Sequence, residues 1–578
     1  MTDQARWCAD VARRIVLGTL AIVVCLGCTD DPSVDSSVGT TETAANRKRR
    51  RSDVLKTLME MSQPETLAIR TRRVTVVSLL NDWVSMSGSR SGASTSETEI
   101  DAIYVSRLDN VLVERLRASR FSKRDVTHIR DALWYSRISK RVASAAKTDL
   151  DRATRLFDYV VRNIVLRSDE DTRLPLAPFG IAMFGEGNAK DRAWLFINLL
   201  RQLRIDGVVL RSSDLAESPA GGLLVGVLLD GKLYLYDPLL GLPVPAVSAT
   251  KGVSAIRPAT LSEAIDNPAV LDSLATPKGV AYRFTSKSLS SVCVSLVGAT
   301  SYWAPRMRPL QLALSSDNDA LLWHPLEPSD IVPEGALARV AKVRGEGFSE
   351  DAITIWEYPE QRLDGNSTLN AQQLQIFRLR SRAFESPIAV TRILANRETR
   401  EVKLEVSAKG QFRHRMSRNR QLLGEWQTAV TTYLKVRMWR DVPPLPKAMS
   451  FIERRDQARF KALLPTRVRL IHEEAADDAG FWTAVCQYEL GRVASAANAQ
   501  REYRERSGPH EWESGSVWLE GLWRGELEQW GEAVSLLETI SEGDPHRGGA
   551  DVLLRRWRPL AAALKKAAAT GSESKVKE

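Results

Sequence analysis

The chain has 578 residues, of which 43% are hydrophobic and 26% are charged, a composition that indicates a globular protein. The length allows three or four domains of ordinary size, and five cysteines are too few for a fold stapled by many disulfides. The 81 basic and 71 acidic side chains leave a formal net charge of +10, a mild excess that favours acidic partners such as anionic lipid or cell-wall polymers.

The first 28 residues predict an export signal. A cationic pair at 13–14 precedes an apolar run of twelve residues, Ile15 to Leu26, which is too short to span a bilayer but suits the core of a cleaved signal peptide. The ending VVCLGC resembles a bacterial lipobox, which implies that Cys28 is diacylated and becomes the mature N-terminus. Since Cys25 stands where leucine is usual, a signal peptide without lipid is one alternative, and a buried N-terminal helix is another.

Residues 29–52 predict a disordered tether, because they contain hardly any bulky apolar side chains. The basic run Arg47–Arg51 would contact anionic headgroups at about 1 kcal/mol per charge, or it is simply a solvated run. In an exported protein it does not indicate nucleic-acid binding. The N-terminus therefore predicts a lipoprotein of the cell envelope, held on the periplasmic or surface side of a membrane by its lipid.

Removal of the signal would leave Cys293 and Cys486 as the remaining thiols. Their flanking segments, VCVSLV and FWTAVCQY, are typical of core, and a single disulfide between them is the alternative. Two such cysteines exclude a cysteine-based metal site.

Helical spacing of apolar residues predicts a helical region over 53–146, interrupted by one Ser/Gly loop. An α+β domain follows over 147–250. It starts with an amphipathic helix in TDLDRATRLFDYVVRNIVL and a second helix in GNAKDRAWLFINLLRQLRI. Three strands, in GVVLR, GGLLVGVLLDG and KLYLYDP, come next, with a hairpin turn at Asp230 and Gly231.

Residues 251–450 predict a mixed α/β region. SSVCVSLVGAT, ALLWHP and AITIWEYP are expected to be strands, and LQIFRLRSRAFE and LLGEWQTAVTTYLKVRMW are expected to be helices. Residues 451–565 predict an all-helical domain, and 566–578 a disordered tail.

The helical domain contains a weak internal repeat with an offset of 37 residues. The recurring pairs are Phe481 with Trp518, Ala484 with Gly521, Val493 with Trp530 and Ala496 with Ala533. This pattern resembles degenerate tetratricopeptide repeats, whose period is about 34 and which place small residues where helices touch. An ordinary Trp-rich helical domain is the alternative.

The run GNAKDRAWLFINLLRQLRIDGVVL resembles the core motif of the transglutaminase-like superfamily, whose fold is papain-like. The motif is Gly-x-Cys-x-Asp, then Ala, Leu-Phe, Leu-Leu-Arg and Gly-Ile-Pro-Ala, and the strand ending in Tyr236, Asp237 and Pro238 also corresponds in order and spacing. The matching positions in the run are Gly187, Asp191, Ala193, Leu195, Phe196, Leu199, Leu200, Arg201, Leu203 and Ile205.

The resemblance implies a fold without the family's chemistry. In the family a cysteine opens the helix as nucleophile, a histidine is the base and an aspartate orients it. Here the cysteine position is Ala189, the histidine position falls at or near Gly222, and Asp237 is the member that is left. Asp237 is alternatively an ordinary turn residue before proline, while Asp191 and Arg201 belong to a solvated helix face or a local ion pair.

Other chemistry is scarce in the sequence. The glycine-rich stretches lack a phosphate-binding pattern, and the tryptophans are interpreted as core more readily than as a glycan-stacking surface. No cofactor or metal is expected, because the histidines are scattered and form no i, i+4 pair: His128, His324, His414, His472, His510 and His546.

Two functions follow from these observations. The first is an exported, membrane-anchored scaffold, with an inactive transglutaminase-like domain retained for its groove and a repeat domain that binds a protein or peptide partner. The second is a hydrolase or transferase with a relocated catalytic site, in which Cys293 or His324 folds against Asp237, since triads are recognised by geometry rather than by chain order.

Overall fold

The structure is a computed structural model. It describes residues 44–575 except 64–69, 87–101, 169–173, 175, 213–221, 247–255, 315–319, 327, 330–331, 344–347, 366–368, 386–389, 396–401, 407–412, 443, 445–460 and 508–510. The export signal, Cys28 and most of the predicted tether therefore lie outside the described residues. Val54–Glu578 forms one compact unit.

Helices make up the N-terminal part of the described chain, as the apolar spacing predicts. Their bounds are α2 (Ala44–Met61), α3 (Arg70–Ser85), α4 (Ala102–Val105), α5 (Asn110–Arg117) and α6 (Lys123–Ala143). Leu80 and Trp83 of α3 and Ile129 of α6 belong to one buried cluster. Helix α2 begins at Ala44, inside the stretch predicted as a tether, because alanine, lysine, arginine and leucine are good helix formers.

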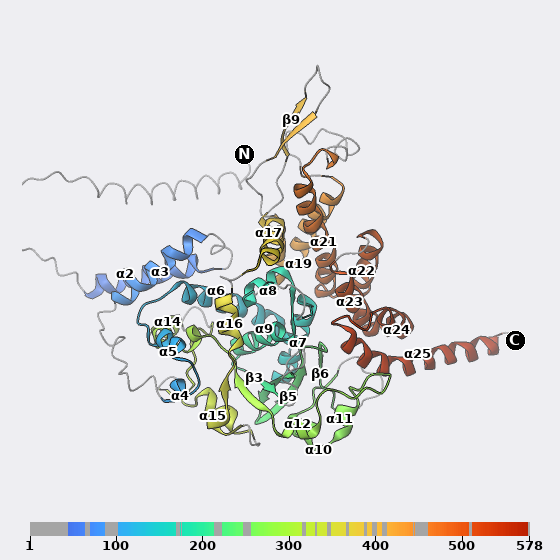
Figure 1. Cartoon of the computed structure of the whole chain (residues 1–578), viewed down its shortest axis with the longest axis horizontal. Coiled ribbons are helices and arrows are strands. Elements are labelled where there is room, and N and C mark those ends of the chain that lie inside the picture. Colours follow the sequence, from blue (N-terminus) through green and yellow to red (C-terminus); the bar gives the residue numbers. More distant parts are fainter. Residues whose placement is uncertain are drawn as a thin grey trace, which may run out of the picture. The chain divides into compact units, whose positions relative to one another are not determined.

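A six-stranded sheet follows, with strand order β6-β5-β4-β3-β7-β8 (Figure 1). Its neighbours pair antiparallel except β7 and β8, which are parallel. Asp230 and Gly231 both have positive φ, 51° and 71°, and make the tight turn predicted between β4 and β5. The strands are β3 (Asp206–Arg211), β4 (Leu223–Leu229), β5 (Lys232–Asp237), β6 (Leu242–Pro243), β7 (Cys293–Leu296) and β8 (Thr354–Ile355).

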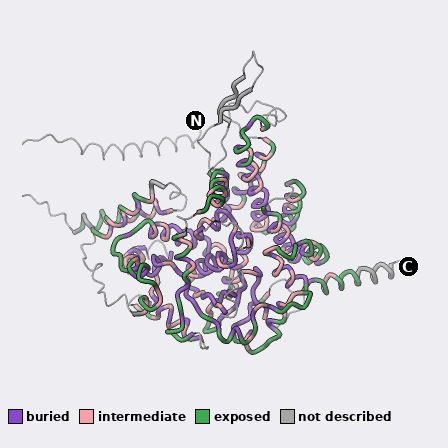
Figure 2. Tube along the Cα trace, in the orientation of Figure 1, coloured by how far each residue is buried: buried purple, intermediate pink, exposed green. Residues whose placement is uncertain are grey.

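Three helices accompany the sheet: α7 (Asp149–Asn163), α8 (Pro178–Phe184) and α9 (Ala189–Gln202). Thr148 caps α7, and Asn188 with Asp191 forms a capping box at the start of α9. Phe157, Phe196 and Tyr236 join α7, α9 and β5 through ring centroids 5.0–5.3 Å apart. Figure 2 accordingly shows this central part of the unit as mostly buried. A short parallel pair, β1 (Val165–Leu166) and β2 (Glu186–Gly187), lies just before α9 in the chain.

The mixed region differs from the sequence prediction at several points. The strand expected in AITIWEYP is limited to Thr354–Ile355, and the helix expected in LLGEWQTAVTTYLKVRMW is divided by a turn at Gly424. ALLWHP, residues 320–325, was expected to be a strand but has no regular structure, because side-chain amides replace the ladder: Gln202 Oε1 accepts from Leu321 N at 2.8 Å and Gln311 Oε1 from Leu322 N at 2.6 Å. The elements of this region are α10 (Leu261–Asp266), α11 (Pro268–Asp272), α12 (Ser286–Ser290), α13 (Thr300–Trp303), η3 (Pro305–Met307), α14 (Arg308–Leu314), α15 (Ala336–Ala341), η5 (Glu350–Ala352), α16 (Tyr358–Gly365), α17 (Ala371–Glu385), β9 (Val390–Ala395) and β10 (Val402–Val406).

The C-terminal region is helical, as predicted, and each helix packs against the next in chain order from α21 to α25. Helix α25 continues to Lys575, through most of the stretch predicted as a disordered tail. The helices are α18 (Arg413–Leu422), α19 (Trp426–Arg437), η6 (Met438–Arg440), α21 (Thr466–Glu489), α22 (Val493–Ser507), α23 (Glu513–Glu526), α24 (Trp530–Glu538) and α25 (Arg547–Lys575).

Three helix pairs in this region, α18–α19, α21–α22 and α23–α24, share one turn. Its middle residue has a left-handed φ: 91° at Gly424, 76° at Gly491 and 59° at Glu528. In each turn this residue's N–H bonds the carbonyl three residues back, and the next N–H bonds the carbonyl five residues back, which is the Schellman arrangement.

Small residues also recur at matching positions of the three pairs. Because the first and second pairs are offset by 67 residues and the second and third by 37, the sequence pattern reveals two copies and the structure adds a third. The recurring buried positions are Ser417, Ala484 and Gly521 on the first helix of each pair, and Ala429, Ala496 and Ala533 on the second.

Candidate functional site

The start of α9 is where the motif would place its nucleophile. Ala189 stands there with 3% of its surface exposed, so a methyl group occupies the position of a thiol. Asp191, two residues on, is not on a solvated face: it is 2% exposed and pairs with Arg362 at 3.2 Å. Tyr358 also donates its hydroxyl proton to Asp191 at 2.7 Å. The first turn of α9 is therefore held in place by side chains of α16.

Asp237, which would orient the base, is fully buried and surrounded by donors. Its Oδ2 accepts from the Tyr282 hydroxyl at 2.6 Å, and its Oδ1 pairs with Arg283 at 2.8 Å. Oδ1 also accepts the backbone amides of Leu239 and Leu240, at 2.9 and 3.1 Å. Asp237 is thus a turn residue and the acidic half of a buried ion pair, with four donors already bonded to its carboxylate.

Gly222, at the histidine position, has φ 50° and directly precedes β4. The candidates for a relocated site lie elsewhere. His324 approaches Arg339, with Nε2 to Nη2 3.3 Å, and Pro325 O, with Nδ1 to O 3.1 Å. Cys293 is exposed and pairs with Arg211 in the sheet register. The bonds of His324 and Asp237 thus place these two residues in separate networks.

The two thiols are both free, so the disulfide alternative is wrong. Cys486 is fully buried on α21, where burial raises the pKa of its thiol far above the usual value. A thiol in this setting remains protonated and is a poor nucleophile. It is a core residue, as its flanking segment predicts.

Arg192 occupies the space beside the motif in a structural role. It lies one turn into α9, is 1% exposed, and donates to Ile164 O at 2.7 Å and to Pro238 O at 3.1 Å. Burial lowers its pKa to about 9, although Asp237 opposes this. Arg192 therefore joins α9 to the turn after β5 through hydrogen bonds to two backbone carbonyls. In the family, a thiol and an imidazole would meet in this region.

The first helices of the repeated pairs pack against the same part of the α+β core. Arg418 of α18 donates to Ala182 O at 2.6 Å and lies 3.4 Å above the ring of Trp482. A Cβ at Gly185 would be only 2.0 Å from Trp482 of α21, and one at Gly515 of α23 would be 2.7 Å from Val165. The helical region therefore covers β1 and the segment that directly precedes β2.

Ser514, Asp544 and His546 form a cluster that the sequence does not predict. The Ser514 hydroxyl lies 2.7 Å from Asp544 Oδ1 and 2.8 Å from His546 Nδ1, while His546 Nε2 accepts the amide of Leu166 at 3.3 Å. Since Nε2 is an acceptor, the imidazole proton is on Nδ1 and points to Ser514, whose own proton goes to Asp544. In this arrangement His546 donates to Ser514 and cannot take its proton, so it does not act as the base that activates a serine. The hydrogen bond from Leu166 to His546 connects the repeat region to β1.

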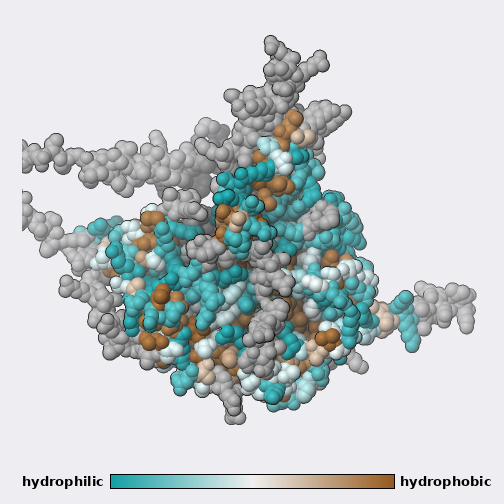
Figure 3. Space-filling view, viewed as in Figure 1, coloured by the Kyte–Doolittle hydropathy of each residue, from teal (hydrophilic) through white to brown (hydrophobic). Residues whose placement is uncertain are grey.

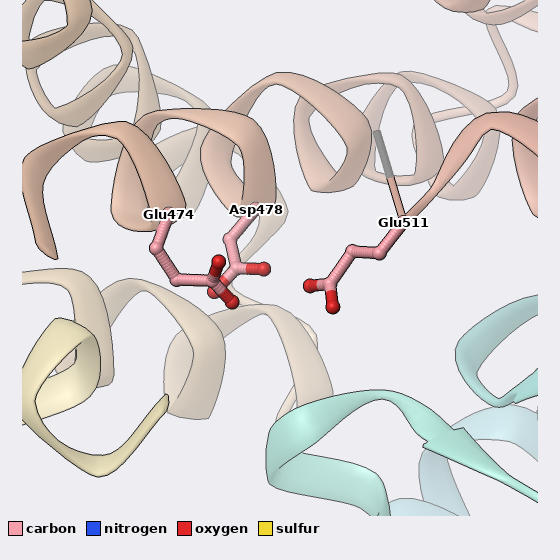
Figure 4. Close-up of side chains that lie close together, drawn as sticks. All are labelled: Glu474, Asp478 and Glu511. Atoms are coloured by element: carbon pink, nitrogen blue, oxygen red, sulfur yellow. The ribbon is translucent and has the colours of Figure 1, made fainter. Parts of the chain in front are cut away.

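Glu474, Asp478 and Glu511 bring three acidic ligand atoms within 4.8 Å of one another. Figure 4 shows Glu474 and Asp478 one turn apart on α21, pointing toward Glu511. The Arg380 guanidinium of α17 bonds all three, at 2.8 Å to Asp478 and 2.6 Å to Glu511. Arg380 thus supplies the positive charge at the place where a cation would sit.

Asp478 is the centre of this group. It is fully buried and also accepts from His414 Nε2 and Trp512 Nε1, both at 2.9 Å. Burial alone would raise the pKa of Asp478, but Arg380 and His414 hold it below its usual value. Burial and the neighbouring carboxylates raise the pKa of the more exposed Glu511 to about 7, against the effect of Arg380.

No family model, curated protein or solved structure matches the chain. Among the helices that the structure describes, none combines the length and the apolar character needed to cross a bilayer. The motif, the contacts and the repeated turn are therefore the grounds on which a function can be proposed.

Proposed function

We propose that this protein is an exported, lipid-anchored binding or scaffold protein, built on a transglutaminase-like domain that no longer catalyses. The helix, strand and turn order around α9 and β3–β5 supports the transglutaminase-like assignment. Cys28 would carry the lipid, with the folded unit on the periplasmic or surface side of the membrane. The lipid anchor and the family assignment come from the sequence motifs.

The observation that carries the proposal is the state of Asp237. A triad aspartate must be able to accept from a histidine, yet four donors bond this carboxylate and one of them is a guanidinium. With alanine at 189 and glycine at 222, these two motif positions supply neither a nucleophile nor a base. Loss of the nucleophile of a triad lowers kcat on the order of 10⁶-fold.

The three helical pairs support a binding role. At least three repeats are normally needed to bury a continuous core, and three copies of the same turn and the same small residues meet that requirement. This strengthens the proposal of a tetratricopeptide-like domain. Such stacks present extended surfaces to peptide or protein partners.

The first pair and the segment that follows it offer a surface for a partner. Of the eleven large apolar side chains that are exposed among the described residues, five lie between 416 and 470, and Figure 3 shows apolar surface around α19 and α21. Clustered exposed apolar groups mark interaction sites more often than singly scattered ones do. The five are Met416, Leu434, Met438, Leu463 and Leu470.

The test of lost catalysis is covalent labelling of the purified protein with a thiol-reactive acyl donor, alongside iodoacetamide. We expect iodoacetamide to modify exposed Cys293, and Cys293→Ser to abolish that signal, while the acyl donor forms no intermediate that turns over with amines. An acyl-enzyme that releases product in the chain itself would overturn the proposal.

The anchor is tested separately in bacteria that produce the full chain. Growth with an alkyne-tagged fatty acid should label the wild-type protein and leave Cys28→Ser unlabelled, and the variant should leave the membrane fraction. Equal labelling of both proteins would remove Cys28 from its proposed role.

A further inference from the structure

A cavity of about 260 Å³ lies at the opposite end of α9 from the degenerate motif. It is bounded by the last turn of α9, the start of β3, the end of β7, α13 and α15. More than half of its lining side chains are apolar. The polar and charged lining groups are Arg201, Arg204, Asp206, Tyr302, His324 and Arg339.

The positive charge of this cavity is only partly balanced. Asp206 is engaged by Arg339 in a two-point ion pair, at 2.6 and 2.9 Å. Arg201 donates instead to neutral acceptors, Asn198 Oδ1 at 3.0 Å and Val297 O. The Arg204 side chain makes no hydrogen bond or ion pair with any residue in the described ranges. Two guanidinium groups therefore face the cavity without a carboxylate partner among the described residues.

Tyr302 adds a buried donor. It is 6% exposed and lies beneath the Arg201 guanidinium, 3.7 Å from the ring centroid, and its hydroxyl has no hydrogen-bond partner in the part of the chain described. Burial raises the pKa of this hydroxyl to about 12, so it keeps its proton at neutral pH. Arg201 and Tyr302 together present donors to whatever enters the cavity.

The backbone at Arg204 points to a selected side chain. Arg204 has φ 62° and closes α9 in a Schellman turn, its N–H bonding Arg201 O while Ile205 N–H bonds Leu200 O. Glycine is the usual residue there, because a Cβ is strained in the left-handed region. The chain thus keeps an arginine beside the cavity at a backbone position that favours glycine.

We propose that this cavity binds a small organic carboxylate, with Arg201, Arg204 and Tyr302 holding the carboxylate and the apolar wall holding an aromatic or branched aliphatic body. Arginine pairs with carboxylates through two parallel hydrogen bonds, and Ile197, Leu296, Trp303 and Leu326 supply apolar contact. The volume lies just below the roughly 300–1,000 Å³ of drug-sized sites, so the ligand is small. The site is independent of the proposed loss of catalysis.

The test is isothermal titration of the folded chain with sodium benzoate, with neutral benzamide and inorganic phosphate as comparison ligands. We expect saturable benzoate binding, at least tenfold weaker binding of benzamide, and weaker binding of phosphate, which cannot use the apolar wall. Absence of saturable benzoate binding up to about 10 mM, equal affinity for benzamide, or tighter binding of phosphate would each overturn the proposal.

Two matched variants localise the binding. Arg204→Gly removes one lining side chain while giving the turn its favoured residue, so it does not threaten the fold. Glu528→Gly makes the same change in the same type of turn after α23, away from the cavity lining. Benzoate affinity should fall at least tenfold in Arg204→Gly and remain at the wild-type value in Glu528→Gly. Equal affinities in both variants would place the anion elsewhere.

Discussion

Replacement of Arg380 by methionine tests the electrostatics that join the repeat region to the core. The side chain is 2% exposed and bonds three carboxylates together with Phe184 O at 2.9 Å. Its removal leaves Asp478 ionised and fully buried, with His414 and Trp512 as its remaining donors among the described residues. Breaking a buried pair in this way lowers the free energy of unfolding by about 3–5 kcal/mol. Glu474 and Glu511, at 17% and 35% side-chain exposure, contribute less because water reaches them.

Urea denaturation followed by tryptophan fluorescence measures this loss as a lower midpoint. Arg380→Lys is the matched control: it keeps the charge but loses the fork that reaches several carboxylates at once, so its midpoint should lie between those of the other two proteins. The destabilisation should also shrink as the pH falls from 8 toward 5. Without Arg380 the native carboxylates have raised pKa values and bind protons more readily than the unfolded chain does, which opposes unfolding at low pH.

Calcium provides the sharpest form of the test. Three carboxylates whose oxygens lie within 4.8 Å suit a cation that binds oxygen at about 2.3–2.6 Å. Calcium at 100 times its dissociation constant would restore about 2.7 kcal/mol to Arg380→Met and leave the wild type unchanged. A variant as stable as the wild type, with no response to pH or calcium, would show that the group is not held ionised by Arg380.

Three further predictions concern the same packing. Gly185→Ala should destabilise by about 2–4 kcal/mol, because its Cβ would enter the Trp482 ring and φ is 76°; an unchanged melting temperature would contradict the contact. His546→Ala should lower stability by about 1–3 kcal/mol, because the buried amide of Leu166 loses its acceptor. Burial lowers the pKa of His546 in the folded chain, although Asp544 opposes this. The stabilisation by His546 should therefore be complete above pH 6.5, the pKa of histidine in the unfolded chain, and should decrease below it. Denaturation at pH 7.5 and at pH 5.5 compares the two conditions. Glu528→Gly should stabilise the protein and Gly491→Ala should destabilise it, each by about 1 kcal/mol, because both positions have a left-handed φ that favours glycine. A Cβ at Gly491 would meet nothing within 4 Å, so the backbone conformation alone sets the effect there. Calorimetric shifts of the same sign in the two variants would refute this reasoning.

Local chemistry explains which parts of the fold the sequence predicts. Thr148 and Asn188 begin α7 and α9 as side-chain caps, and Asp230 with Gly231 reverses the chain between β4 and β5. Each of these signals acts over three or four residues, so it can be recognised without knowledge of tertiary contacts. The mixed α+β class and the helical C-terminus follow from such signals.

Long-range contacts explain what the sequence does not predict. The Arg380 group brings together residues 94 to 131 positions apart, and no spacing rule links them. The strand expected at 320–325 does not form, because the Gln202 side chain of α9, 119 residues earlier than Leu321, accepts the backbone N–H of Leu321. The first helical pair cannot be recognised from a fixed repeat length, because it precedes the second pair by 67 residues, whereas the second precedes the third by 37. Arg204 of the cavity has one local feature in the sequence: it is a residue other than glycine at the point where α9 ends.

The two ends of α9 carry opposite electrostatic arrangements. At its N-terminus the amides and the dipole favour an anion, and the chain supplies its own in Asp191. At its C-terminus the dipole opposes an anion by about 0.3–1 kcal/mol, so a carboxylate binds there only if other groups outweigh that field. Charge-assisted hydrogen bonds contribute about 1.5–3 kcal/mol each, and Arg201 and Arg204 together exceed the dipole several-fold. Removing Arg204 alone should therefore reduce affinity, while loss of both arginines should exclude the anion from the cavity.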